Sequence, residues 1–257
     1  MKYSPINILD DVEIYTGSMS YAIAGKESNN ILDNDTLRVY ASLGNIDVSI
    51  FNIGGASMDF VSLVNVFFDE TLTIQLYDVG NSLLYEETFG VNDWTGLDNK
   101  YIYMLVPSNI EYIDRIRVFT TGDDYTENWI GYIWAGMLID IGCFEFQGIK
   151  PVSVSNDSVQ ISRTNHPHIN ESYLYRELDF TSKVTNDWKT VRAYGEIILS
   201  DGYGKGRPWI IEEEPFDGEM MFAILDAPKI QNDYIYVNVS TRNNNGGQFT
   251  LGLREVT

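Results

Sequence analysis

The stretch that decides the fold is IRVFTTGDDYTENWIGYIWAGMLIDIGCFEFQG, which runs from Ile116 to Gly148. It opens on alternating apolar and polar residues, passes through an acidic turn, and ends in an apolar block interrupted by Gly131, Gly136 and Gly142. Short alternating runs bounded by Gly and Asp are typical of half-buried β-strands. The stretch therefore predicts a strand, a turn and a second, more deeply buried strand.

The same pattern recurs upstream, and helical periodicity is nearly absent. Strands are predicted over residues 47–53, 60–68, 72–77, 101–106 and 115–120, each bounded by Gly, Asn, Asp or Pro. The segment TLTIQLYDVGNSLLYEETF predicts a hairpin that turns at residues 78–81. Closely spaced strands and turns favour an all-β sandwich or barrel.

A second β-rich region is expected after Gly148-Ile149-Lys150-Pro151. A hairpin is predicted over residues 152–163, further strands over residues 188–199, 220–225, 234–240 and 249–254, and a short helix over residues 174–184. The predicted domains are therefore residues 1–148 and residues 149–257. The predicted class is all-β, with a sandwich followed by a second β-sandwich or barrel domain.

Composition narrows the range of partners. The formal net charge is −20, and aromatic residues make up 13% of the chain, led by 17 tyrosines. A polyphosphate backbone would be repelled by this charge, so direct nucleic-acid binding is not expected. The longest apolar block, residues 129–144, is too short for a membrane span, so membrane insertion is not expected either.

The candidates for metal binding are few. His166 and His168 are the only histidines, and no further His or Cys completes a zinc set with them. The sole cysteine, Cys143, is interpreted as a small buried hydrophobe. Asp33 and Asp35 are weak candidates for calcium because carboxylates are the hard ligands that this ion prefers. Asp123 and Asp124 offer the same chemistry, and no EF-hand spacing is present.

Catalytic patterns are weaker still. Glu212, Glu213 and Glu214 could supply the paired carboxylates of a glycosidase, but a solvated acidic loop is the simpler interpretation. The GYGKG segment at residues 202–206 lacks the Ser or Thr of a P-loop and is interpreted as a turn. We therefore assign no catalytic or cofactor-binding residue and expect a protein that is not an enzyme.

Two tryptophans are candidates for stacking on a sugar ring. Trp94 and Trp129 lie in turn-rich contexts, and amphipathic rings suit wet recognition surfaces. Trp134, Trp188 and Trp209 are interpreted as core residues.

Several segments together resemble the galactose-binding-like, discoidin-type jelly roll. These are NNILDNDTLRVYAS (29–42), MDFVSLVNVFF (58–68), TLTIQLYD (71–78) and RIRVFTTGDDYTENWIGYIWAG (115–136). The resemblance implies a jelly-roll sandwich over the first half of the chain, with loops at one end that hold a sugar and often calcium. By position these loops would include Asp33 and Asp35.

The whole-chain layout also resembles virion proteins of tailed bacteriophages, through the glycine block at Ile130-Gly131, Gly136 and Gly142 and the closing LGLREVT. This resemblance implies a non-enzymatic structural component of the tail or tail tip, which assembles with other tail proteins as a homo-oligomeric ring. The chain would be assembled in the host cytoplasm, since its start carries no apolar signal-peptide core. The alternative is a carbohydrate-binding module for a cell-surface glycan, and a third reading is a glycan-degrading enzyme.

Overall fold

The computed structural model describes residues 1–9, 12–16, 21–22, 26, 28–32, 39–94, 101–123, 125–142, 144–153, 160–161, 167–168, 174–182, 206–225 and 250–255. The chain divides into two units. Unit 1 comprises residues 1–142 and 206–222, and unit 2 comprises residues 143–205 and 223–257. The sequence predicted two independent domains that meet near residue 148. The division into two units does not test this boundary, which stays a prediction.

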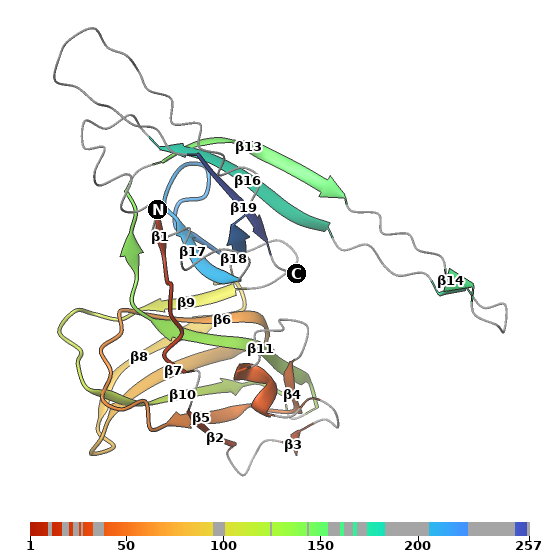
Figure 1. Ribbon diagram of the computed structural model, residues 1–257. Coiled ribbons are helices and arrows are strands. Elements are labelled where there is room, and N and C mark those ends of the chain that lie inside the picture. Colours follow the sequence, from red (N-terminus) through yellow and green to blue (C-terminus); the bar gives the residue numbers. More distant parts are fainter. Residues whose placement is uncertain are drawn as a thin grey trace, which may run out of the picture. The chain divides into compact units, whose positions relative to one another are not determined.

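Most of unit 1 is a sandwich of two five-stranded antiparallel sheets, drawn as two layers in Figure 1. The first sheet has the order β2 (Glu13–Thr16), β5 (Asp47–Phe51), β10 (Ile113–Thr121), β7 (Thr71–Asp78) and β8 (Leu83–Gly90). The second has the order β3 (Tyr21–Ala22), β4 (Tyr40–Leu43), β11 (Glu127–Gly136), β6 (Phe60–Phe67) and β9 (Tyr101–Leu105).

The pairing of these strands defines the topology. β4 pairs with β11, β5 with β10, β6 with β9 and β7 with β8, so the eight strands form one long hairpin rolled across two sheets. That nested pairing is the eight-stranded jelly roll. The predicted jelly-roll sandwich is confirmed, and β2 and β3 extend its two sheets at one edge.

The core between the sheets follows from two-residue periodicity. On β7, Leu72, Ile74 and Leu76 are fully buried, and on β5 Val48 and Ile50 point the same way. Successive side chains of a strand point to opposite faces, so the residues between these lie on the outer face of the first sheet. A short 3-10 helix, η1 (Ser28–Leu32), adds the buried side chain of Ile31 to the core.

The predicted turn at residues 78–81 is also confirmed. Asn81 has a φ of 65°, its amide donates to the carbonyl of Asp78, and the amide of Ser82 donates to Asp78 Oδ1 at 2.7 Å. Asn tolerates this left-handed conformation because its side chain is short and polar. The local sequence therefore fixes the register of the β7–β8 hairpin.

The outer face of the second sheet is partly covered within unit 1. The cover comes from β1 (Lys2–Tyr3), β12 (Ile139–Asp140), β17 (Arg207–Ile211) and the first part of β18 (Glu219–Leu225). Phe222 packs edge-on against Tyr132 and Trp134 of β11, with ring centroids 5.7 and 6.2 Å apart. Trp209 stacks on Tyr3 at 4.9 Å. Trp134 and Trp209 are thus core residues, as predicted.

Unit 2 adds further antiparallel sheet. β13 (Phe144–Ser153) pairs with β16 (Leu174–Ser182), which pairs with β19 (Thr250–Glu255), and β14 (Gln160–Ile161) pairs with β15 (Pro167–His168). The short helix predicted over residues 174–184 is wrong. β16 is hydrogen-bonded on both sides, and Leu178 and Phe180 are buried at two-residue spacing, so sheet pairing overrides local propensity.

The strands predicted at 220–225 and 249–254 correspond to β18 and β19 and are confirmed. Those predicted at 188–199 and 234–240 lie outside the described residues. The hairpin predicted over residues 152–163 is wrong where it is described, because Val152 and Ser153 of β13 pair with β16 and β14 pairs with β15; its expected turn at residues 156–157 lies outside the described residues. The all-β class is confirmed in the described part of the chain. Across those ranges, no helix has the length and apolar character that a bilayer crossing needs.

Candidate functional site

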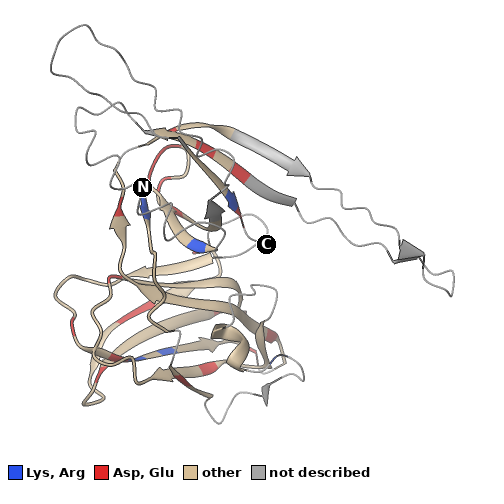
Figure 2. Ribbon diagram, viewed as in Figure 1, with Lys and Arg blue, Asp and Glu red and all other residues tan. Residues whose placement is uncertain are grey.

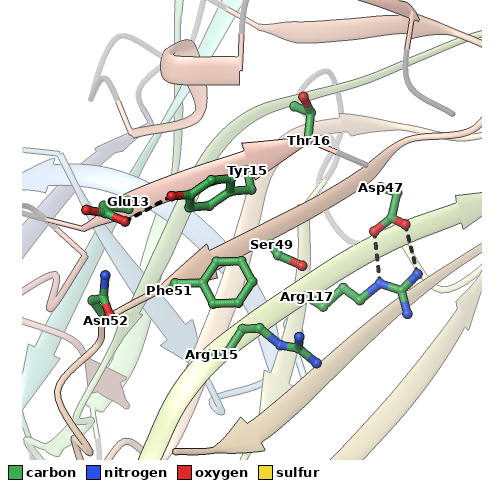
Figure 3. Close-up of a pocket in the computed structure, with 9 residues that line it drawn as sticks. All are labelled: Glu13, Tyr15, Thr16, Asp47, Ser49, Phe51, Asn52, Arg115 and Arg117. Carbon is green, nitrogen blue, oxygen red and sulfur yellow. Dashed lines mark hydrogen bonds and ion pairs between the residues drawn. The ribbon is translucent and has the colours of Figure 1, made fainter. Parts of the chain in front are cut away.

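The site is a hollow of about 560 Å³ on the outer face of the first sheet. We call it the sheet-face hollow. It is lined by residues of three adjacent strands and the turn that follows β5, namely Glu13, Tyr15, Thr16, Asp47, Ser49, Phe51, Asn52, Arg115 and Arg117 (Figure 3). Its size lies within the range of small-ligand sites.

Two aromatic rings form its apolar part. Tyr15 of β2 is 57% exposed, and its ring meets the edge of Phe51 on β5 at a centroid distance of 5.3 Å. The hydroxyl of Tyr15 donates to Glu13 Oε2 at 3.3 Å. A large exposed ring held by a neighbouring ring offers an apolar platform with a polar edge, which suits a ligand that has both kinds of surface.

Arg117 on β10 is fixed by a fork of hydrogen bonds to Asp47 on β5. Its Nε donates to Oδ1 at 2.9 Å and its Nη2 donates to Oδ2 at 2.8 Å. Its Nη1 reaches Gln75 Oε1 at 3.5 Å. The hydrogen bond to Asp47 raises the pKa of the guanidinium further above its usual range, so this residue is always charged. The pair is therefore a rigid wall of the hollow rather than a mobile binding group.

Arg115, two residues earlier on the same face, is held differently. Its Cζ atom lies 3.7 Å from the ring centroid of Tyr77 and 5.4 Å from that of Phe51. The Tyr77 hydroxyl donates to Gln75 Oε1 at 2.6 Å, and Gln75 Nε2 donates to Glu86 Oε2 at 2.9 Å. The ring under Arg115 is thus held in place by its own hydrogen bonds.

The two tryptophans predicted to contact a glycan lie away from the hollow: Trp129 is on β11 of the second sheet, and Trp94 is in the segment that follows β8. Trp129 stacks on Phe67 with centroids 4.4 Å apart, and Trp94 packs against Phe67 at 5.8 Å and edge-on against Phe68 at 5.2 Å. Both are half-buried, and the structure joins them through one shared phenylalanine. Neither lines the sheet-face hollow, so their role as glycan contacts stays a prediction.

Most of the candidate metal ligands cannot be placed. Asp33 and Asp35 lie outside the described residues, as do Cys143 and His166. Within the described ranges, no three His, Cys, Asp or Glu residues come together in a way that could hold a metal ion. The calcium hypothesis for Asp33 and Asp35 therefore stays a prediction.

Glu212 is described and lies outside the hollow. Its Oε1 accepts a hydrogen bond from Lys2 Nζ at 2.6 Å, and this bond lowers the pKa of the carboxyl group. A general acid for glycoside hydrolysis needs the opposite shift, because it must carry its proton near neutral pH. This residue is therefore a poor general acid.

Sequence reasoning missed the sheet-face hollow, although a signal was present. Arg115 and Arg117 alternate with Ile116, so both guanidinium groups lie on one face of a predicted strand. The partner residues come from strands separated in sequence, and their register is fixed only by the fold.

The sequence matches no protein-family model, and it matches no curated protein. Among solved structures it is similar to the CpGH89CBM32-4 module of Clostridium perfringens in complex with GlcNAc-alpha-1,4-galactose. That similarity has 21% identity and a TM-score of 0.39, and it covers 52% of this chain and 93% of that one.

Two further similarities have comparable extent. The family 32 CBM of C. perfringens NanJ, solved with galactose, shows 11% identity and a TM-score of 0.41 over 52% of this chain and 98% of that one. A chitosan-binding module from a Paenibacillus chitosanase/glucanase shows 17% identity and a TM-score of 0.36 over 51% and 98%. At such low values, the likenesses say nothing about what this chain binds.

Proposed function

We propose that unit 1 is a non-catalytic carbohydrate-binding module whose ligand lies in the sheet-face hollow. The observation that supports this most is the exposed ring of Tyr15 beside Phe51, on a sheet face that also carries convergent polar groups. A sugar ring has an apolar face of C–H groups and a rim of hydroxyls. The hollow provides a matching aromatic platform and, around it, donors and acceptors on Glu13, Asn52 and Arg115.

The polar groups are also held in place before any ligand arrives. Arg117 and Asp47 fix each other through two hydrogen bonds, and Gln75 holds Tyr77 beneath Arg115. Groups ordered in the unbound protein lose little entropy on binding, which raises the affinity available from few contacts. The hollow is therefore suited to recognition by a rigid surface.

The test is binding of the full chain to a panel of neutral and acidic oligosaccharides, followed by calorimetric titration of the hits. Tyr15→Ala should weaken the tightest interaction at least fivefold, about 1 kcal/mol, because a central exposed ring carries a large share of binding energy. Tyr125→Ala is the matched control, since Tyr125 is 89% exposed and does not line the hollow. Affinity unchanged by Tyr15→Ala would remove the hollow as the site, and a parent chain that binds no saccharide would remove the function.

The expectation of a tailed-phage tail component, with a homo-oligomeric ring and a location in the virion, stays a prediction. It is compatible with glycan binding, since one protein can assemble into a particle and carry a binding site. Particle mass by light scattering at rising protein concentration tests it directly: closed rings would support assembly, and a strict monomer would weaken it.

A further inference from the structure

The basic residues of the jelly roll are concentrated in one place. Between Val39 and Gly142 the sequence has fifteen acidic residues and three basic ones. Two of the three, Arg115 and Arg117, lie on the same face of β10 and both line the sheet-face hollow. In the ribbon of Figure 2, the blue positions of Lys and Arg are sparse beside the red positions of Asp and Glu. The hollow is therefore a local exception to a strongly acidic surface.

The two arginines differ in how their charge is satisfied. Arg117 is engaged by the carboxylate of Asp47 through two hydrogen bonds. Arg115 makes no ion pair with any carboxylate in the described part of the chain, and its Nε is buried without a hydrogen-bond partner there. The rings of Tyr77 and Phe51 hold its guanidinium by cation–π contact, but a ring face does not accept several N–H bonds at once.

A positioned guanidinium that lacks an acceptor is matched best by a planar carboxylate. The fork of N–H groups can meet both carboxylate oxygens in parallel, which is the strongest geometry available to arginine. Glu13 and Asp47 also line the hollow, so the two arginines and two carboxylates sum to zero before ligand binds. Asp47 is paired with Arg117, which leaves Arg115 as the lining cation available to a carboxylate of the ligand.

We propose that the sheet-face hollow selects a saccharide that carries a carboxylate, such as a uronic-acid residue, with Arg115 bonding the carboxylate while Tyr15 stacks on the sugar ring. This inference rests on the proposed carbohydrate-binding function and specifies its ligand class. Arg117, through its hydrogen bonds to Asp47, would form a fixed wall of the hollow, and Arg115 would donate hydrogen bonds to the carboxylate of the ligand.

The experiment compares each acid with its own neutral form. Oligogalacturonate, a hyaluronan oligosaccharide and sialyllactose are titrated into the full chain beside their methyl esters, which keep the sugar and remove the charge. We expect at least one acid to bind tenfold or more tightly than its ester. Esters or neutral sugars that bind as tightly as the acids would overturn the inference while leaving carbohydrate binding intact. Absence of binding by every saccharide would instead overturn the proposed function, and this inference with it.

Variants then assign the selectivity to one residue. Arg115→Gln should bring the acid-to-ester affinity ratio to within about twofold of one, because it should lower the affinity for the acid far more than the affinity for the ester. Arg115→Lys keeps the positive charge but loses the pair of parallel N–H donors of the guanidinium, so the acid-to-ester affinity ratio should fall at least threefold. Lys26→Gln is the matched control, because it also removes one positive charge from the chain. Lys26 pairs with Glu127 and does not line the hollow. Equal losses for acid and ester in a folded Arg115→Gln chain would contradict the proposal, as would equal effects of the two Gln variants. Tighter binding of a sulfated sugar than of every carboxylated one would also overturn the carboxylate assignment.

Discussion

The Asp47–Arg117 pair allows a quantitative test of how rigid the sheet-face hollow is. A double-mutant cycle of Asp47→Ala, Arg117→Ala and the double variant isolates the coupling between the two side chains. The pair makes hydrogen bonds of 2.9 and 2.8 Å, but the side chains of Arg117 and Asp47 are 35% and 28% exposed. Fully exposed pairs contribute about 0.2–1 kcal/mol and hydrogen bonds to charged groups about 1.5–3, so we expect a coupling of about 1–1.5 kcal/mol.

The coupling is measured from urea unfolding curves at neutral pH, with tryptophan fluorescence as the signal that monitors unfolding. Four of the five tryptophans, Trp94, Trp129, Trp134 and Trp209, lie in unit 1 and report mainly on its transition. Because the pair is partly shielded from solvent, raising the salt concentration to about 1 M should leave more than half of the coupling. The cycle also cancels the separate contacts of Arg117 with Gln75 and Phe119, since these are lost in both arms.

A coupling below about 0.3 kcal/mol would refute the reasoning. It would mean that Asp47 and Arg117 behave as an ordinary solvated surface pair. The wall of the hollow would then be mobile, and the argument that binding groups are held in place before the ligand arrives would fail.

Two further predictions concern stability. Burial, aided by the charge of Asp93, raises the pKa of Glu87 above its ordinary value, so the charged form of Glu87 lowers the stability of the fold at neutral pH. The Glu87→Gln variant should therefore have a higher Tm at pH 7, and this gain should disappear below about pH 4.5, where the carboxyl group is protonated in both the folded and the unfolded chain. An unchanged or lower Tm at pH 7 would contradict this prediction. Gly136→Ala should lower the free energy of unfolding by about 1–3 kcal/mol, because the new Cβ would overlap the Ile6 carbonyl oxygen. Gly90→Ala is the control, since a Cβ at that position meets only ordinary van der Waals contacts. Equal urea midpoints for the Gly136→Ala and Gly90→Ala variants would contradict this prediction.

The strand framework of unit 1 could be predicted because local patterns carry it. On β7 the alternation of Leu72, Ile74 and Leu76 with polar residues is visible in the sequence, and Asp78 and Asn81 mark the turn. Each of these signals depends on neighbouring residues alone. The helix expected over residues 174–184 failed for the opposite reason, since the conformation of β16 is decided by two partner strands distant in sequence.

The candidate site could not be predicted in the same way. Arg115 and Phe51 meet only because β10 and β5 are paired in a particular register, with Ile116 opposite Ile50. A shift of one residue would place the same arginines in the core. Tyr15 reaches the hollow through β2, an edge strand whose exposed sequence gives little periodic signal.

Unit 1 is discontinuous, and this affects the order in which its parts appear during synthesis. All the side chains that line the sheet-face hollow have been made once Arg117 is added, but Phe222, which packs on Tyr132 and Trp134, follows Gly142 by 80 residues. At about 5–20 residues per second the ribosome needs roughly 4–16 s for that interval. During it, the aromatic face of β11 lacks the packing that Phe222 provides. Nascent chains halted before Phe222 has left the ribosome should therefore recruit chaperones that recognise exposed aromatic surface, and chains halted after it has left should release them.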